Sequence, residues 1–571
     1  MSNMCRKILI IFLLLAPSTG LWAQNLEQIG EKGGVKLNGG INVNQIFYAV
    51  NGIEQRRDPY SYFLSGNVAL DLYGWSIPFS FSFSNQNSSF QQPFNQYGVH
   101  PTYKWVTAHL GWASMNFSPY TLNGHLFLGA GVEANPTDKW RFSGMYGRLQ
   151  QAVEQDTLRG TDAAFRRMGY GFKASYGTGA DHLDLTLFRA KDDENSIVIP
   201  DAEENTLPEE NLVLSAAGSK MIFKKLVLSA EWATSAITRD IRAEESEAVE
   251  RLFDYTGNLF TPRISSAYYN AYNAKLTYQA KIYSMGLGYE RIDPGYRTLG
   301  AYYFNSDLEN ITANATLAML KGKLNLGVNT GVQRDNLDDT KVSAMRRWVG
   351  SLNATYAASK KLNFNASYSN FQTFTNIRNQ FENINQLTPY DNLDTLNYTQ
   401  ISQNANLNVV YMMKATKEKR QTINMNISVQ DAADMQGEVE QNSGTRFYNI
   451  NTAYSLALVP QQTSLTAAFN YSKNESVLAN AVTLGPTLAL NRTFFERKLR
   501  STFSASWNNA YSNGNLLSQV LNLRLMGAYT LKKKHNISLN LVSLTRENKQ
   551  DGQTGSSFTE FTGTLGYSFN F

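Results

Sequence analysis

Cysteine, charge and long apolar runs are all scarce in this chain of 571 residues. The one cysteine is Cys5, so the body of the chain forms no disulfide and has no thiol chemistry. The only continuous apolar run covers residues 8–16, well short of the roughly 20 residues that a membrane-spanning helix needs, which excludes a polytopic helical membrane protein. Charged residues make up 17% of the chain, against roughly 25% in ordinary soluble domains, which indicates strands that do not all face water.

Aromatic residues, by contrast, are plentiful. Tyr and Phe occur 31 times each, aromatic residues make up 12% of the chain, and they are spread along its length. That abundance excludes a chain without a folded core. The formal net charge of +5 is small for the length and no basic tail stands out, so we expect no nucleic-acid partner.

The N-terminus has the parts of a secretory signal peptide. Arg6 and Lys7 precede the apolar run, and the small residue Ala23 stands where a signal peptidase would cut. A membrane anchor would need a longer apolar segment. We therefore predict a signal peptide at 1–23, cleavage between Ala23 and Gln24, a short periplasmic segment at 24–34 and the folded domain at 35–571.

The body of the chain alternates apolar and polar residues with the period of a β-strand. Each alternating stretch covers roughly ten to sixteen residues, whereas strands of soluble sandwiches and propellers have about five or six. A tilted strand that crosses a bilayer needs about ten residues, and an exported sheet in lipid must close so that no edge meets lipid. The pattern predicts an all-β fold: a single-chain antiparallel transmembrane β-barrel.

The end of the chain resembles the C-terminal assembly signal of Gram-negative outer-membrane β-barrel proteins, with Thr564, Gly566, Tyr567, Phe569 and Phe571 in the matching positions. The resemblance implies the cell outer membrane as the location, with its lipid and lipopolysaccharide as surroundings. It also implies that the barrel-insertion machinery reads the last strand. Gln24 and the strands rich in Asn and Tyr resemble the large barrels of the Bacteroidota.

Short and long connections alternate along the chain. In outer-membrane barrels, short turns face the periplasm and long loops face the outside. The short connections fall at 136–138, 321–323, 360–361, 417–419, 460–462 and 532–534, and the long ones at 191–210, 239–263, 293–307, 334–341 and 375–397. This alternation predicts the topology independently of hydrophobicity.

Counting back from the C-terminus gives about 21 strands from Leu122 onward. Four further candidates precede them, at 35–47, 60–73, 77–85 and 103–112, and the stretch 91–100 lies between the last two. Because single-chain barrels have an even number of strands, one of these pieces is not an ordinary crossing. We predict about 24 strands, with 26 as the alternative, and an inward or capping loop at 85–124.

Charge is divided between the two sides of the predicted barrel. The short turns are rich in lysine, whereas acidic residues gather at 192–210, 240–250 and 335–339 in the long loops. An acidic mouth raises the local cation concentration and offers oxygen ligands to calcium or to the divalent ions that bridge lipopolysaccharide. No loop has calcium-motif spacing, so the favoured interpretation is solvated loops without a bound metal.

Arginines are the candidate lumen residues. Arg500 and Arg524 occupy inward positions among Ser, Thr and Asn, as a polar lumen requires. Arg148 and Arg189 lie near predicted strand ends, where they would line the pore. The competing interpretation is structural, because lumen arginines often pair with acidic residues across a barrel.

The sequence predicts no catalytic residue, no cofactor and no metal site. His100, His109 and His125 gather in one stretch, but their spacing matches no zinc motif. A hydrolytic set can be drawn only from residues that proximity alone connects, namely Ser118, His125, Glu133 and Asp138. We therefore expect that the protein is not an enzyme.

Two functions from different classes fit these features. The first is a passive or substrate-selective channel for small solutes, because a barrel of this circumference is too wide for side chains to fill. The second is a non-enzymatic surface scaffold or a partner subunit of an export or uptake assembly, with loops 239–263 and 375–397 contacting a protein partner. TonB-driven uptake is disfavoured, because receptors of that family carry a plug before the barrel and alternation here begins near Val35.

Overall fold

A computed structural model describes most of the chain. The described residues are 35–85, 95–155, 163–198, 206–246, 253, 256–302, 304–340, 346–370, 403–432, 435–436, 439–440, 445–476, 480–549 and 557–571. The predicted signal peptide, the segment 24–34 and the cut site between Ala23 and Gln24 lie outside these residues.

Most described residues form β-strands, because the alternating sequence gives each strand one apolar and one polar face. The first strands are β1 (Lys36–Asn51), β2 (Tyr60–Leu72), β3 (Trp75–Ser84), β4 (Gln96–Val99), β5 (Thr102–Tyr103), β6 (Val106–Asn116), β7 (Asn123–Ala134), β8 (Trp140–Gln150), β9 (Arg166–Thr178), β10 (Asp181–Asp193), β11 (Glu210–Ile222), β12 (Leu226–Thr238), β13 (Ser266–Gln279) and β14 (Tyr283–Ile292). The next are β15 (Leu308–Met319), β16 (Leu324–Arg334), β17 (Arg346–Ala357), β18 (Leu362–Ser369), β19 (Gln403–Ala415), β20 (Lys419–Ala432), β21 (Met435–Gln436) and β22 (Val439–Glu440). The last are β23 (Thr445–Leu458), β24 (Thr463–Ser476), β25 (Asn480–Phe494), β26 (Leu499–Ser512), β27 (Asn515–Leu531), β28 (His535–Asn548) and β29 (Phe558–Asn570).

Helix is almost absent from the described residues. Two 3₁₀ turns occur, η2 (Gly257–Leu259) and η3 (Leu320–Gly322). Within the described part of the chain, no helix has the length and apolar character to cross a membrane.

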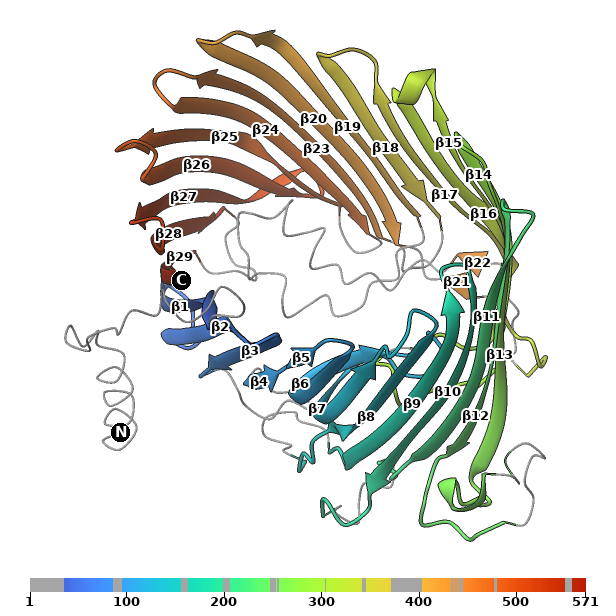
Figure 1. Cartoon of the computed structure of the whole chain (residues 1–571). Helices are drawn as coiled ribbons and strands as arrows, with labels where there is room; N and C mark the ends of the chain where they lie inside the picture. Colours follow the sequence, from blue (N-terminus) through green and yellow to red (C-terminus); the bar gives the residue numbers. More distant parts are fainter. Residues whose placement is uncertain are drawn as a thin grey trace, which may run out of the picture.

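The strands form one closed antiparallel barrel. Every wall strand pairs with its neighbour along the chain, and β1 pairs with β29 from Gly40 opposite Asn570 to Asn51 opposite Thr559. Across this seam the Tyr48 hydroxyl also donates a hydrogen bond to Glu560. Figure 1 looks into the barrel and shows the continuous wall, with β1 beside β29 at the left. The predicted all-β antiparallel barrel is confirmed.

The barrel has 26 strand positions, which is the alternative count from the sequence rather than the first choice of 24. From β7 onward the wall contains 21 strands, as predicted. The difference lies in the N-terminal part, where β4 and β5 both pair with β3 on one side and β6 on the other, as two pieces of one interrupted strand. Pro101 separates the pieces, because proline has no N–H to give to the ladder.

The inward or capping loop that the sequence places at 85–124 therefore needs narrower bounds. In the described part of that segment, β4, β5 and β6 belong to the barrel wall. Among the described residues of the segment, the longest stretch that leaves the wall is 117–122, between β6 and β7. Aromatic residues and prolines made the whole segment resemble a loop, whereas pairing to β3 and β7 makes most of it wall.

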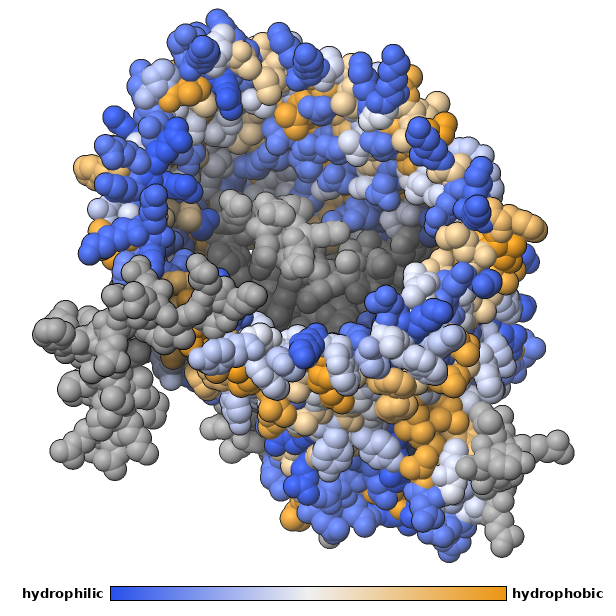
Figure 2. Space-filling model, viewed as in Figure 1, coloured by the Kyte–Doolittle hydropathy of each residue, from blue (hydrophilic) through white to orange (hydrophobic). Residues whose placement is uncertain are grey.

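The two faces of the wall differ as a transmembrane barrel requires. Large apolar side chains that alternate along the strands are exposed on the outside, for example Leu185 on β10, Leu287 on β14 and Phe469 on β24. Residues of opposite parity point into the lumen and are mostly polar. Figure 2 shows mainly hydrophilic residues on the visible inner wall, and hydrophobic patches among hydrophilic residues on the outside.

Most connections follow the predicted alternation of short and long, but the outer connection between β26 and β27 has only two residues, Asn513 and Gly514. The turn between β27 and β28 is short, with Lys532 at φ 49° and Lys533 at φ 60°, the left-handed geometry that matches the twist of a hairpin. The connections after β10, β12 and β14 are long. With long loops outside and short turns in the periplasm, β8, β10, β12 and β14 run outward.

Candidate functional site in the barrel lumen

Two outer loops leave the wall and fold into the lumen. One is residues 117–122 between β6 and β7, and the other is residues 293–307 between β14 and β15, of which all but 303 are described. Together we call them the inner shelf. Phe117, Tyr120, Leu122, Tyr296 and Leu299 of the shelf are all buried, each 3% exposed or less.

Hydrogen bonds join the two loops to each other. The Tyr296 hydroxyl donates to the carbonyl of Tyr120 at 2.8 Å, and the Thr298 hydroxyl donates to the carbonyl of Thr121 at 2.8 Å. The amide of Asn123 donates to the carbonyl of Gly300 at 2.9 Å. Because one loop follows β6 and the other follows β14, these bonds cross the concave inner face of the strands between them.

The underside of the shelf is apolar and packs on the wall. Shelf residues form one buried cluster with inward side chains of β7 to β14, including Phe127, Phe188, Val213, Ala271 and Ile292. Burial of a large apolar side chain stabilises a fold by about 1.5–3 kcal/mol. A core of this kind inside the barrel therefore holds the shelf firmly in the lumen.

A network of charges anchors the shelf at its outer side. Arg167 on β9 donates to Asp192 on β10 through Nε at 2.7 Å and Nη2 at 2.8 Å, and Nη2 also donates to Glu209 at 3.0 Å. From the shelf, Nη2 of Arg297 donates to the same Glu209 at 3.0 Å. The side chains of Asp192 and Arg167 are only 3% and 13% exposed, so each depends on the other for charge compensation.

Tyr120 joins the first loop of the shelf to β14. Its hydroxyl donates to Glu290 of β14 at 2.7 Å. Burial, and then the neighbouring Glu290, raises the pKa of the Tyr120 hydroxyl well above its usual value. The hydroxyl therefore keeps its proton at neutral pH and remains a donor to the carboxylate.

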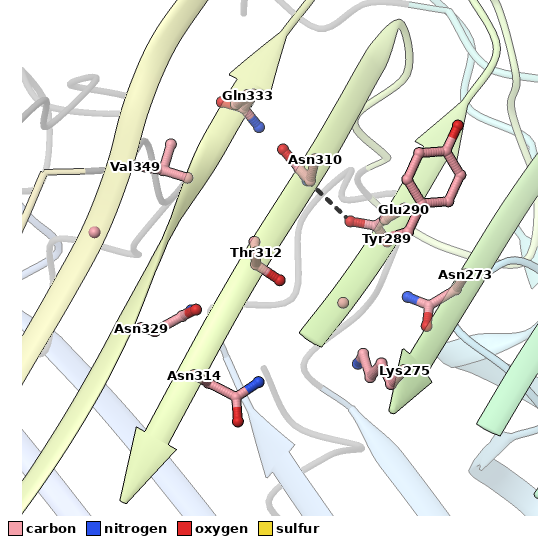
Figure 3. A pocket seen from close by; sticks show the side chains of 12 residues that line it. Asn273, Lys275, Tyr289, Glu290, Asn310, Thr312, Asn314, Asn329, Gln333 and Val349 are labelled. Carbon is pink, nitrogen blue, oxygen red and sulfur yellow. Dashed lines mark hydrogen bonds between the residues drawn. The ribbon is translucent and has the colours of Figure 1, made fainter. Parts of the chain in front are cut away.

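Beside this contact lies a groove on the inner wall of β13 to β17, with a cavity volume of about 380 Å³. Figure 3 shows its side chains, among them Lys275, Glu290, Asn310, Asn314, Asn329 and Gln333. Asn310 Nδ2 donates to the second oxygen of Glu290 at 3.0 Å, so Glu290 links the shelf to the groove. Amides and hydroxyls that both donate and accept hydrogen bonds dominate this lining.

Amide side chains continue around the lumen. A row of directly opposed residues runs across β18, β19, β20, β23 and β24, namely Asn365, Asn408, Asn426, Asn451 and Asn470. We call it the amide row. Asn451 donates to Asn470, and Asn470 Nδ2 donates to Thr487 on β25 at 3.0 Å. This side of the lumen therefore presents uncharged hydrogen-bonding groups to water and solutes.

Arg500 and Arg524 lie on the inward face, where the sequence placed them. Phe503 and Trp507 are exposed on the outside of β26, and Arg500 has the opposite parity, so its side chain points inward. Arg524 alternates with Leu523 and Leu525 on β27, and its Nε donates to Asn540 of β28 at 3.0 Å. Their role in conduction stays a prediction.

Arg148 and Arg189 lie on the other face, which corrects their proposed position in the pore. Arg148 has the parity of Trp140 and Tyr146, which are exposed on the outside of β8, whereas the neighbouring Leu149 is in the inner core. Arg189 has the parity of the exposed Leu185 on β10, and Phe188 points inward. Nearness to a strand end does not decide the face; the alternation does.

The histidines and the candidate hydrolytic set do not converge. His100 and His109 meet through their Nδ1 atoms at 3.0 Å, but His125 stacks on Tyr302 with ring centroids 4.0 Å apart. Ser118 Oγ lies 3.0 Å from Thr121 Oγ1, within the shelf. Among the described residues no group of three or more His, Cys, Asp or Glu side chains is arranged to hold a metal.

The C-terminal residues form the outer face of β29 at its periplasmic end. His535 of β28 stacks on Phe569 with centroids 4.7 Å apart, and its Nδ1 lies 2.8 Å from the Tyr567 hydroxyl. Phe571 contacts Phe569. This is the geometry of an aromatic belt at a membrane interface. Recognition of Thr564, Gly566 and these rings by the insertion machinery stays a prediction.

The loop between β12 and β13 packs outside the barrel. Its described apolar residues Phe253, Leu259 and Phe260, which we call the outer hood, contact Leu212 of β11 and Tyr268 of β13. Leu212 has the outward parity of Leu214, so this second apolar cluster lies on the opposite side of the wall from the shelf. The other predicted contact loop, 375–397, lies outside the described residues.

Comparisons with known proteins give weak similarities only. No protein-family model and no curated protein matches the sequence. Among solved structures, a variant of the ferric enterobactin receptor of Pseudomonas aeruginosa matches over 95% of this chain and 81% of that one, with 10% identity and a TM-score of 0.41. The P pilus usher translocation pore matches over 94% and 99%, with 10% identity and a TM-score of 0.31. An anion-selective porin of Comamonas acidovorans matches over 54% and 93%, with 11% identity and a TM-score of 0.29.

Such low values leave the class of protein to be argued from this chain. A closed antiparallel barrel satisfies every wall hydrogen bond without water, which is the condition for crossing lipid. Its outside is apolar with aromatic rings near the ends, and its inside is polar. The chain is a transmembrane β-barrel of the outer-membrane type.

Proposed function

We propose that the protein is a passive channel that admits small polar solutes through a lumen narrowed by the inner shelf. One observation carries the proposal: a barrel of 26 strand positions has amides and hydroxyls along one inner side and a shelf packed on the other. Barrels of this width are not filled by wall side chains, so the interior depends on what folds into it. A shelf on one side leaves a polar path along the groove and the amide row.

The polar lining favours hydrated, uncharged solutes as cargo. Primary amides replace lost water contacts as donors and acceptors without holding an ion. A solute that passes through the lumen on this side meets such groups on neighbouring strands from β13 to β24. The scaffold alternative has less support, because the described rings of the outer hood already pack against this chain's own wall.

Conductance of the purified barrel in planar bilayers tests the proposal. We expect discrete channel steps, and we expect proteoliposomes to admit neutral sugars up to a size limit. Heat-modifiable migration on gels establishes that the same preparation is folded. A folded barrel that shows no steps and admits no sugar, both with and without the inner shelf, would contradict a channel function.

Reversing the charge of Arg500 and Arg524 provides a sharper test. Both side chains lie on the inner face, so the double variant Arg500→Glu and Arg524→Glu replaces two lumen cations by anions. We expect the reversal potential in a salt gradient to move towards cation selectivity, because wall charges change the local ion concentrations. The matched control is Arg148→Glu with Arg166→Glu on the outer face, for which the reversal potential should not move.

A further inference from the structure

The outer surface of β8, β9 and β10 ends in a group of cations. Arg148, Arg166, Arg189 and Lys191 all have outward parity and lie in the last residues or first residue of their strands on the extracellular side. We call them the rim patch. Two of them, Arg148 and Arg189, are the arginines that the sequence had placed in the pore.

Nearby carboxylates compensate only part of this charge. Arg166 pairs with Asp193, and Arg189 Nε donates to Glu210 at 3.0 Å. Lys191 Nζ lies 3.9 Å from the same Glu210, which Arg189 already engages. Among the described residues, the patch thus has two carboxylates for four cations, whereas Arg334 with Glu309 and Arg446 with Asp431, elsewhere on the outward rim, are one-to-one pairs.

Arg148 is the member whose charge is least satisfied. Within the described residues no carboxylate pairs with it, and its buried Nε has no hydrogen-bond partner. Its guanidinium lies 6.0 Å from the ring centroid of Trp112, which is 8% exposed. The ring therefore fixes the height of the guanidinium on the wall while leaving its donors for another group.

The pairing of strands brings Arg148 and Lys191 to one level. Arg148 is opposite Met168 on β9, and Met168 is opposite Lys191 on β10. Neighbouring strands are about 4.8 Å apart, so the two cations start roughly 10 Å apart, with the Met168 side chain between them. Both side chains are long enough to reach one tetrahedral anion above Met168 when Arg148 turns from Trp112 of β6 towards β9 and Lys191 turns from Glu210 of β11 towards β9.

The patch also lies at the height of lipid headgroups. On β8, the outward residues Trp140, Phe142 and Tyr146 precede Arg148 from the periplasmic side. Those eight steps span about 26 Å along the strand, or about 20 Å of height at a tilt of about 40°, so Arg148 lies near the outer edge of an apolar band of roughly 25 Å if Trp140 lies in the periplasmic aromatic belt. The cations therefore begin where the acyl chains of the outer leaflet end.

We infer that the rim patch binds a phosphate group of an outer-leaflet glycolipid, with Arg148 and Lys191 as the direct ligands. The acyl chains of the lipid would lie along the outward Tyr146, Tyr170 and Leu185, below the phosphate. Arg189 acts as a positioning residue, because its pair with Glu210 keeps that buried carboxylate from competing for Lys191. This inference does not depend on what the lumen conducts.

Lipid binding by the detergent-purified full chain tests the inference. The probes are diphosphorylated lipid A, the same lipid without phosphates, and inorganic phosphate. We expect the phosphorylated lipid to bind about tenfold or more tightly than the dephosphorylated one, and the double variant Arg148→Gln and Lys191→Gln to lose that preference, because charge-assisted bonds to phosphate are lost. The matched control is Arg446→Gln, a paired outward-rim cation far from the patch, which should bind like the wild type.

Three outcomes would overturn the inference. The first is equal preference for the phosphorylated lipid in the wild type and the double variant when both show folded, heat-modifiable migration. The second is competition by inorganic phosphate at concentrations similar to those of the lipid, which would make the patch a site for free anions. The third is an altered reversal potential in the double variant, which would return Arg148 to the pore.

Discussion

Replacing residues 294–306 with a short glycine-serine linker is expected to raise the single-channel conductance roughly twofold or more, because the shelf fills one side of a wide lumen. The shelf is joined to residues 117–122 and packs on the inner face of β7 to β14, so its removal empties the space in front of those strands. The measurement is the step size in planar bilayers at fixed salt. The size limit for neutral sugars in swelling proteoliposomes should rise in parallel.

The outer hood supplies the matched control for loop removal. Shortening the β12–β13 loop between 241 and 264 also deletes an outer loop with a buried apolar cluster, but that cluster lies outside the wall. The conductance of this hood-deletion variant should equal that of the wild type. If the shelf deletion and the hood deletion gave the same step size, the shelf would not restrict the pore.

Arg167→Met is expected to destabilise the folded barrel by about 3–5 kcal/mol, the usual cost of breaking a buried ion pair from one side. The change removes the cation that Asp192 and Glu209 share, while their carboxylates stay 3% and 15% exposed. Methionine keeps most of the side-chain length, so lost packing contributes little. Unfolding in urea, followed by tryptophan fluorescence, measures the change in stability.

Arg166 offers a control one residue away. Its pair with Asp193 is 51% and 31% exposed, so Arg166→Met should cost about 1 kcal/mol or less. The double variant Arg167→Met with Asp192→Asn should recover part of the loss, because one stranded carboxylate is neutralised. Equal losses of stability in Arg166→Met and Arg167→Met would show that burial of the Arg167–Asp192 pair does not determine what it contributes to stability.

The wall of the barrel was predictable because alternate residues of each strand face lipid and the polar lumen, and their side chains differ accordingly. That regularity predicted the 21 strands from β7 onward and the places of the short turns. It failed where the alternation is interrupted: Pro101 divides one strand into β4 and β5, and neither piece is long enough to stand out. Only the pairing with β3 and β6, a tertiary property, shows that this stretch is wall.

The lumen was less predictable, because loops have no periodicity to read. Buried Tyr296 and Leu299 looked like ordinary outer-loop residues, and nothing local tells that Thr298 meets Thr121 across the barrel. Arg148 and Arg189 are a different case. Their faces were available from the sequence, since Arg148 shares its parity with Trp140 and Tyr146, yet they were assigned by nearness to strand ends instead.

The seam between β1 and β29 also constrains how the barrel can be made. Tyr48 and Glu560 meet across 512 residues of chain, so β1 must wait for the synthesis of β29 before it has its second partner. Until then both strands expose unpaired backbone, the condition that favours mispairing and aggregation. Closing a loop of this length costs conformational entropy before the seam contacts form. Assembly in the membrane is therefore all-or-none at its final step: one hairpin after another can form, but none of them is sealed from lipid until the two ends of the chain meet.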